Sequence, residues 1–144
     1  MKLTKFVPRS ITIELDDQAK DLTLDFAAIR KINEQVNAID EACYVYRIAD
    51  GSERADPIRL STFFTVLCNL AGVTLDGEEL QAEDVYNSIM QNIDLLSGIV
   101  DVCFQAALAI VPLDENEQLG EVKKATKKPQ VRAKKTTTKK QAAG

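Results

Sequence analysis

The chain has 144 residues, which is enough for one domain of ordinary size and short for two. Its net charge of −4 is unevenly divided, because residues 121–144 carry +8 and the first 120 residues carry −12. The sequence contains no His, which removes the usual general base and the usual zinc ligand. With 45% hydrophobic residues, the composition predicts an acidic globular body followed by a basic end.

The N-terminal region predicts a β-hairpin. Its first ten residues contain charges but no long apolar run, so we expect no secretory signal. Residues 10–15 (SITIEL) alternate apolar and polar side chains, which is the period of a half-buried strand. We expect the polar residues 16–21 to form a turn, after which residues 22–24 (LTL) resume the alternation. Because an isolated hairpin is marginally stable in water, it should pack on helices or extend another sheet.

An amphipathic helix is expected after the hairpin, with Asp25 as its N-cap residue. The apolar side chains that follow recur at steps of three and four residues, as one face of a helix requires. They are Phe26, Ile29, Ile32, Val36 and Ile39. Residues 40–49 fit a second helix, although their tyrosine and valine residues favour a strand as much as a helix.

A strongly apolar helix is predicted after a loop at residues 50–57. Either Asp56, followed by Pro57 at the first helical position, or Ser61 begins this helix, and Gly72 is expected to end it.

A turn at residues 73–79 and a short helix over residues 82–91 follow, with two acids in the first turn of the helix, where its dipole favours them. The last predicted helix lies in the most apolar stretch of the chain, residues 93–111, and Pro112 is expected to end it. Two Asp residues interrupt this stretch, which favours a buried or partner-facing helix over a membrane span. Its predicted apolar face is Ile93, Leu96, Val100, Cys103, Ala107 and Ile110.

Residues 114–144 differ in character from the rest of the chain. They contain almost nothing to bury, so we predict that the domain covers residues 1–113 and that the remainder is disordered. Spaced basic residues attract phosphates without base specificity, but no aromatic residues are interleaved with them. The segment therefore predicts a nucleic-acid contact, a solubilising tail or a tether to an acidic protein. Its basic residues are Lys123, Lys124, Lys127, Lys128, Arg132, Lys134, Lys135, Lys139 and Lys140.

The sequence offers little for catalysis, and we expect neither enzymatic activity nor a cofactor. Its glycines are isolated, so no phosphate-binding loop is present, and no acidic run has the spacing of a calcium loop. The densest acidic run, residues 76–84, is expected to be a solvated loop and helix start. The three Cys residues lie far apart in apolar stretches, which predicts buried thiols in a reducing compartment.

These elements predict a mainly α fold, with an N-terminal β-hairpin, four or five short helices and a disordered basic tail. So many helices in a short domain leave apolar faces, and the hairpin leaves strand edges, for a partner or for self-association. We therefore expect protein binding and no membrane contact. The candidates for the core or for a partner-binding face are Phe26, Ile29, Ile32, Phe63, Phe64, Leu67, Leu96 and Val100.

Three short motifs follow one another between residues 10 and 111: an alternating hairpin leading into an Asp-Phe helix, a Leu-Ser helix with an aromatic residue, and a Leu-x-x-Glu-Asp-Val helix start. In this order they resemble the tail assembly chaperones of long-tailed bacteriophages. Gln81 stands where members of that family commonly have Thr or Ser. The matching residues are Asp25, Phe26, Ala28, Ile29, Leu60, Ser61, Phe64, Leu67, Leu80, Glu83, Asp84 and Val85.

The resemblance implies a small helical protein that coats and solubilises the tape-measure protein before the tail tube polymerises around it. Such a chaperone acts in the host cytoplasm and is absent from the mature virion. Many members have a longer form, made by a programmed ribosomal frameshift, whose extension recruits tail-tube subunits. The Lys-Lys pairs of this chain fit slippery codons, so a longer product is a hypothesis for this gene.

Two other functions remain open from the sequence. A nucleic-acid-associated protein would act through the basic tail, with binding that weakens steeply as salt rises. A minor structural protein of the virion, such as a tail-completion factor, would remain in the purified particle.

Overall fold

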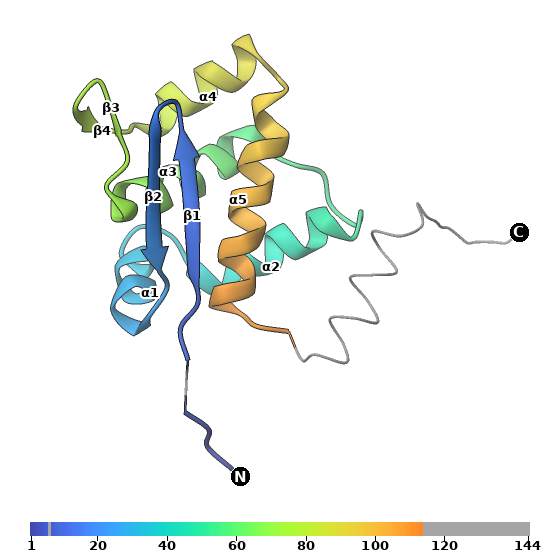
Figure 1. Cartoon of the computed structure of the whole chain (residues 1–144). Coiled ribbons are helices and arrows are strands. Elements are labelled where there is room, and N and C mark those ends of the chain that lie inside the picture. The colour runs from blue at the N-terminus through green and yellow to red at the C-terminus, as the bar shows by residue number, and fades with distance from the viewer. Residues whose placement is uncertain (6, 114–144) are drawn as a thin grey trace, which may run out of the picture.

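The computed structural model describes residues 1–5 and 7–113, which form a mainly helical domain with an N-terminal hairpin, as predicted. Among these residues, five helices and two antiparallel hairpins follow one another in the order shown in Figure 1. The predicted tail and its basic residues lie outside the described part of the chain. The elements are β1 (Ser10–Leu15), β2 (Gln18–Thr23), α1 (Phe26–Asn33), α2 (Ala38–Ala49), α3 (Pro57–Ala71), β3 (Thr74–Leu75), β4 (Glu78–Glu79), α4 (Ala82–Gln91) and α5 (Leu95–Ile110).

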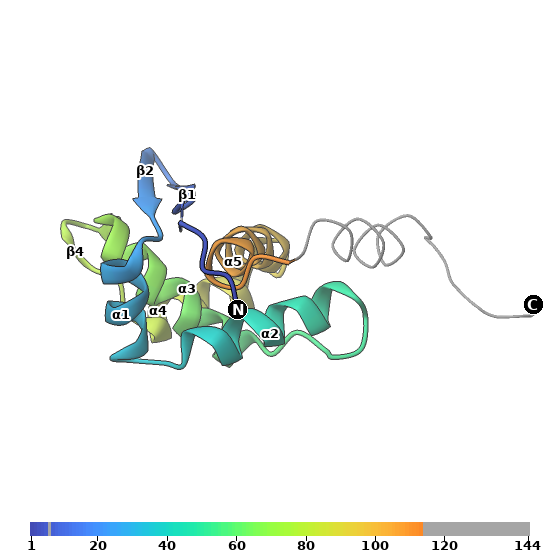
Figure 2. The same cartoon turned by 90° about the horizontal axis from the view of Figure 1, so that it is seen from below.

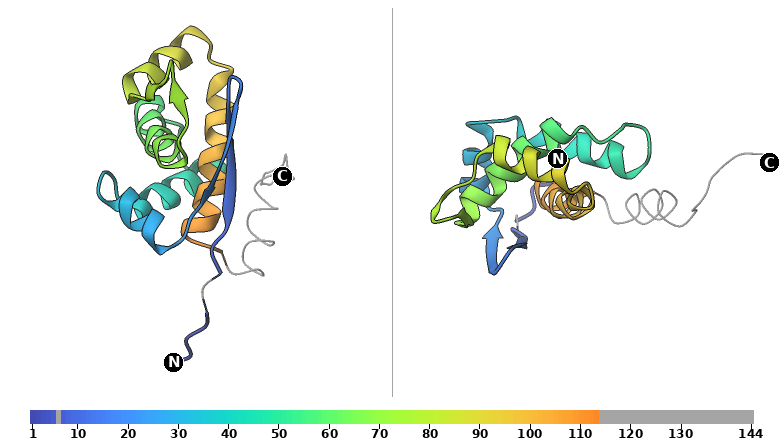
Figure 3. Two further views of the ribbon diagram at one scale, coloured as in Figure 1. Left: turned by 60° about the vertical axis from the view of Figure 1, so that its left-hand side comes forward. Right: turned by 90° about the horizontal axis from the view of Figure 1, so that it is seen from above.

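The first hairpin lies on one side of the helices. β1 contacts α5 and β2 contacts α3, so the buried face of the hairpin covers both helices. Seen from below, the hairpin stands apart from a layer of helices (Figure 2), and a side view shows it running along α5 (Figure 3). Because α2 also packs against α5 and α4 packs against α3, the core is enclosed between the hairpin and the helices.

The turn of the first hairpin is shorter than predicted. Leu15 pairs with Gln18, so Asp16 and Asp17 alone connect the strands, and Asp16 has a left-handed backbone with φ of +53°. The predicted turn over residues 16–21 is therefore wrong. Most of the side chains in the first part of β2 are exposed, and exposed strand residues do not show the apolar alternation that reveals a buried strand.

The single apolar face predicted over residues 26–39 is also wrong, because α1 ends at Asn33 and α2 begins at Ala38. The side chain of Asn33 accepts a hydrogen bond from the backbone N–H of Ala38, at 2.7 Å. The side chain of Asn37 accepts one from the backbone N–H three residues later, at 3.0 Å. Such Asn side chains offer the backbone an alternative to a continuous helix. Ile39, 58% exposed, consequently lies in the first turn of the next helix.

Capping resolves the alternatives that the sequence left open. Residues 40–49 are helical as part of α2. Asp56 begins α3, since its carboxylate accepts hydrogen bonds from two backbone N–H groups of the first turn, and Ser61 lies inside the helix. Asp25 caps α1 in the predicted way, and Gly72 ends α3 in the left-handed conformation expected there.

The predicted face of α5 is displaced relative to the buried one. Ile93 precedes the helix and is 60% exposed, while Leu96 and Val100 are only half-buried. Cys103 and Ala107 of the predicted face are buried, but the other buried side chains of the helix lie outside that face: Ile99, Ala106 and Ala109. Because α5 contacts α2, α3 and β1, it is buried over a wide arc, and periodicity alone does not choose between its apolar rows.

Candidate protein-binding groove

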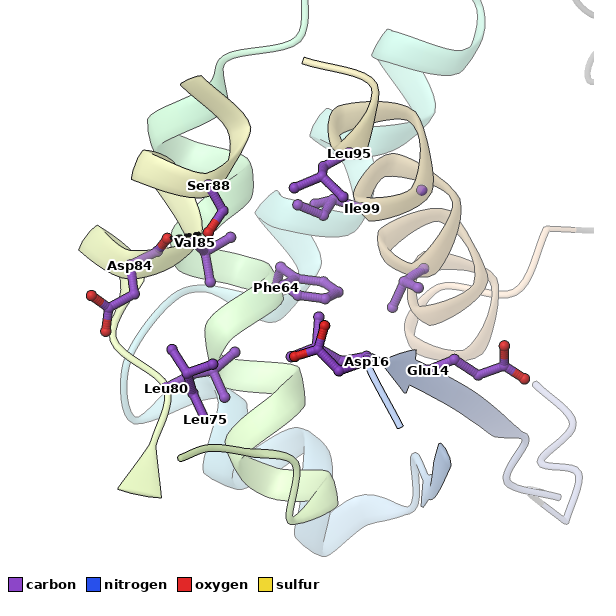
Figure 4. A pocket seen from close by; sticks show the side chains of 13 residues that line it. Glu14, Asp16, Phe64, Leu75, Leu80, Asp84, Val85, Ser88, Leu95 and Ile99 are labelled. Atoms are coloured by element: carbon purple, nitrogen blue, oxygen red, sulfur yellow. Dashed lines mark hydrogen bonds between the residues drawn. The ribbon is translucent and has the colours of Figure 1, made fainter. Parts of the chain in front are cut away.

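An apolar groove lies between the turn of the first hairpin, the β3–β4 hairpin, α3, α4 and α5 (Figure 4). Its cavity volume is about 270 Å³. Apolar side chains supply most of its lining, and they come from segments far apart in the sequence. Six of them are Leu15, Phe64, Leu80, Val85, Ile99 and Val102.

The floor of the groove belongs to the core, and its walls are open to solvent. Phe64 and Ile99 are 4% and 8% exposed, and the Phe64 ring lies between the α3–α4 side and the α5 side in Figure 4. The walls include Leu75 and Leu95, which are 36% and 42% exposed. Apolar side chains left in water next to a preformed hollow are typical of a site that binds an apolar group of a partner.

Two side-chain amides fix the wall formed by β3 and β4. The Gln18 side chain forms two hydrogen bonds with the backbone of Thr74, accepting at its Oε1 at 3.0 Å and donating from its Nε2. Asn69 does the same with Leu80, donating at 3.1 Å and accepting at 3.0 Å. Each side-chain amide donates one hydrogen bond to the backbone and accepts one from it, as the backbone of a neighbouring strand would do. Leu75 and Leu80 are therefore held at the groove from both ends of this short hairpin.

The connection between α4 and α5 extends the apolar surface beside the groove. Met90 and Ile93 are 49% and 60% exposed, and they lie close in sequence to the groove residue Leu95. The Asn92 side chain shapes the connection by accepting a hydrogen bond from the backbone N–H of Asp94 at 3.2 Å. Exposed apolar residues at this connection offer contact area in addition to the hollow itself.

Acidic side chains edge the groove. Glu14 and Asp16 come from the hairpin and Asp84 from the first turn of α4. In Figure 4 the carboxylates of Glu14 and Asp84 point away from the apolar side chains. Residues 60–113 contain no Lys or Arg, so every charged side chain in this half of the domain is an Asp or a Glu. A ligand of the groove therefore meets negative charge around an apolar floor.

The ion pairs between described residues lie elsewhere and have a structural role. Arg47 pairs with Glu53 near the end of α2, and Arg59 pairs with Glu41 between α3 and α2. The Arg59 Nε donates to both oxygens of Glu41, at 3.0 and 3.2 Å, and this raises the pKa of the guanidinium. The same guanidinium lies 3.9 Å from the centroid of the Tyr44 ring. These contacts fasten α2 to α3.

Two of the three thiols are poor nucleophiles in this fold, because they are buried. Cys68 and Cys103 are buried and Cys43 is half-buried. Burial raises the pKa of Cys68 to about 12 and that of Cys103 further still, so both remain protonated near neutral pH. Across residues 1–5 and 7–113, no three Cys, Asp or Glu side chains gather in a way that would hold a metal ion.

The residues predicted for the core or for a partner face fall into different places. Phe64 lies in the groove, and three others are fully buried in the core: Ile32, Phe63 and Leu67. Ile29, Leu96 and Val100 are half-buried against the core and do not line the groove.

Phe26 is not a core residue. Its side chain is 74% exposed, although the sequence places it first on the apolar face of α1. The Arg30 guanidinium lies 5.9 Å from the centroid of its ring, one helical turn further on. Since α1 is only eight residues long, its buried side is carried by Ile32 and, in part, by Ile29.

Several groove residues escaped sequence reasoning. Leu75 stands in a stretch expected to be only a turn, and Leu95 and Ile99 lie outside the face predicted for α5. Leu95, Ile99 and Val102 form a second apolar row of α5 with the same helical spacing as the predicted row. The choice between the two rows depends on the neighbouring segments, which periodicity does not reveal.

In the part of the chain that the structure describes, no helix combines the length and the apolarity that crossing a membrane requires. Comparison with protein-family models, with curated proteins and with solved structures found no match for this chain.

Proposed function

We propose that this chain is a tail assembly chaperone of a long-tailed bacteriophage, which binds the tape-measure protein and keeps it soluble until the tail tube forms. The apolar groove is the observation that carries the proposal. An amphipathic helix binds a groove of this kind through apolar anchors spaced by one helical turn. Before assembly, a long helical protein offers many such anchors to water.

The size of the groove sets the stoichiometry that the proposal requires. A hollow of about 270 Å³ accommodates only a few side chains of one helix. Many copies of the chain are therefore needed to cover a long tape-measure protein. The excess of acid on the described domain, with 18 acidic and nine basic residues in positions 1–113, would keep such a complex soluble.

Two further parts of the proposal follow from the resemblance to the chaperone family. The protein would act in the host cytoplasm and leave before the virion is complete. A frameshifted longer form would carry the extension that recruits tail-tube subunits. The order of hairpin, Asp-capped helix and Leu80-Asp84-Val85 helix start is the feature that the chain shares with this family.

Co-expression with the tape-measure gene of the same genome tests the proposal. We expect the tape-measure protein to move from the insoluble to the soluble fraction when this chain is present. A variant with the groove filled, Gly98→Phe, should lose this effect, whereas Gly98→Ala should keep it. A tape-measure protein that is equally soluble with and without the chain would exclude the chaperone function.

The basic segment beyond residue 120 supports a second candidate, a nucleic-acid-associated protein. Deleting residues 121–144 should then abolish salt-sensitive retardation of duplex DNA. For a minor virion protein, the corresponding test is mass spectrometry of purified virions, which should detect a structural component and miss a chaperone.

A further inference from the structure

A basic, partly apolar segment precedes β1. Residues 1–9 contain Lys2, Lys5 and Arg9 and no acidic residue. Leu3 and Val7 in the same segment are 85% and 75% exposed. The segment thus combines apolar side chains and cations, which is the complement of an apolar groove edged with carboxylates.

The segment and the groove lie at opposite ends of the domain. β1 begins at Ser10, opposite Thr23, and its other end reaches the Asp16 turn, which edges the groove. Figure 1 shows the N-terminal segment leaving the domain at the end of the hairpin remote from this turn. The segment is therefore directed away from the groove of its own chain (Figure 1).

We propose that the N-terminal segment of a second copy of this chain occupies the groove when no partner helix is bound. Leu3 and Val7 would lie on the groove floor, and Lys2 and Lys5 would lie among the three carboxylates of the edge. Arg9 stays with its own domain, where its backbone carbonyl accepts a hydrogen bond from the Leu24 N–H at 2.8 Å. The eight residues before Arg9 reach about 26 Å when extended, which is enough to leave one domain and enter another.

The arrangement joins two different surfaces, so it propagates. A contact between the N-terminal segment of one copy and the groove of the next is heterologous. It produces an open chain of copies unless the rotation between successive copies closes a ring. The carboxylate–cation contacts are exposed, so the association should weaken as salt screens them. A partner helix would compete with the segment for each groove.

Sedimentation of the full chain over a range of concentrations in low salt tests the proposal. We expect larger species as the concentration rises, and we expect the double variant Leu3→Ser with Val7→Ser to stay monomeric. Ile39→Ser with Ile58→Ser is the matched control, because those side chains are 58% and 63% exposed and lie away from both surfaces. A parent chain that is monomeric throughout, or a segment variant that associates as the parent does, would overturn the proposal.

A fluorescent peptide with the sequence of residues 1–9 identifies the surface that is bound. It should bind the segment variant, whose grooves are free, and fail to bind the same variant carrying Gly98→Phe. A Cβ built on Gly98 meets no atom within 4 Å, and Gly98 lines the groove, so a side chain added there starts from open space at the groove. Equal binding to both proteins would place the peptide elsewhere and overturn the proposal.

Charge at the groove edge is tested with the same peptide. Neutralising the three carboxylates should weaken binding about tenfold, and the loss should shrink at high salt. Binding that does not change would remove the electrostatic part of the proposal. The edge variant combines Glu14→Gln, Asp16→Asn and Asp84→Asn, and its control combines Glu34→Gln, Asp40→Asn and Asp50→Asn.

The inference uses the groove of the proposed function but not its partner, so the two fail separately. A monomeric chain that still solubilises the tape-measure protein would overturn self-association alone. A self-associating chain that leaves the tape-measure protein insoluble would overturn the chaperone function alone.

Discussion

Asn69 and Leu80 are joined by two hydrogen bonds between the side-chain amide of the first and the backbone of the second. The pair ties α3 to the residue that precedes α4, and both of its bonds are partly buried. Asn69→Asp keeps the acceptor but replaces the donor with a carboxylate oxygen that faces the Leu80 carbonyl. We expect a loss of about 1–3 kcal/mol in the free energy of unfolding, measured by urea denaturation.

The same substitution should weaken binding at the groove, because Leu80 lines it. Gln18→Glu, which makes the equivalent change at the Thr74 pair, is a second test of the same idea. If both variants unfold at the urea concentration of the parent, the amide pairs do not hold this wall.

Phe26 and Phe63 should respond very differently to truncation. Phe63→Ala removes a ring that is 1% exposed and should cost about 3–5 kcal/mol. Phe26→Ala removes a ring that is 74% exposed and should cost less than about 1 kcal/mol. Thermal unfolding of the two variants checks the difference, and a large loss from Phe26→Ala would mean that α1 packs more closely than described.

Gly98→Ala should stabilise the chain. Gly98 lies inside α5, where glycine costs about 1 kcal/mol relative to alanine, and the added Cβ meets nothing within 4 Å. We expect a rise in the midpoint of thermal unfolding, with binding at the groove retained. A lower midpoint would show that α5 needs the freedom of glycine at this position.

Stability should fall at alkaline pH. Burial raises the pKa of Cys68 from 9.0 to about 12 and that of Tyr46 from 10.0 to about 12. In both cases the side chain loses its proton at a lower pH in the unfolded chain than in the folded one. The stability that these two groups contribute to the folded state is therefore complete below pH 9, and it is lost progressively as the pH rises to about 12. With no His in the chain, the free energy of unfolding should change little between pH 6 and 8.

Urea unfolding at a series of pH values measures this dependence. Tyr46→Phe should reduce the slope above pH 10. It should also lower stability at pH 7, because the Tyr46 hydroxyl donates to the carbonyls of Ala107 and Val111 at the end of α5. A free energy of unfolding that stays constant up to pH 11 would contradict the prediction.

Local signals in the sequence predicted the helix ends well and the groove poorly. Asp25, Asp56 and Gly72 act on their own neighbours, so their types and positions are informative without the rest of the fold. The break near Asn33 was missed because the apolar spacing continued across it, while the competing hydrogen bonds depend on the path of the backbone.

The groove depends on contacts between distant segments. Gln18 and Thr74 are separated by 56 positions, and neither belongs to an apolar pattern that would suggest their contact. Phe64 was among the predicted residues because it is large and apolar, not because its position beside a hollow was visible. The same apolar residue types occur in the core and in the groove, and the two sets differ only in whether other side chains or solvent lie next to them.

The packing of β1 against α5 has a consequence for the nascent chain during translation. The first strand to be synthesised is covered by the last described helix, so the core stays open until about 110 residues have left the ribosome. A premature stop before α5 would leave the apolar faces of the hairpin and of α2 uncovered, and such a product should aggregate or be degraded. A change of reading frame after residue 113 would instead leave a complete domain whose groove works in both products.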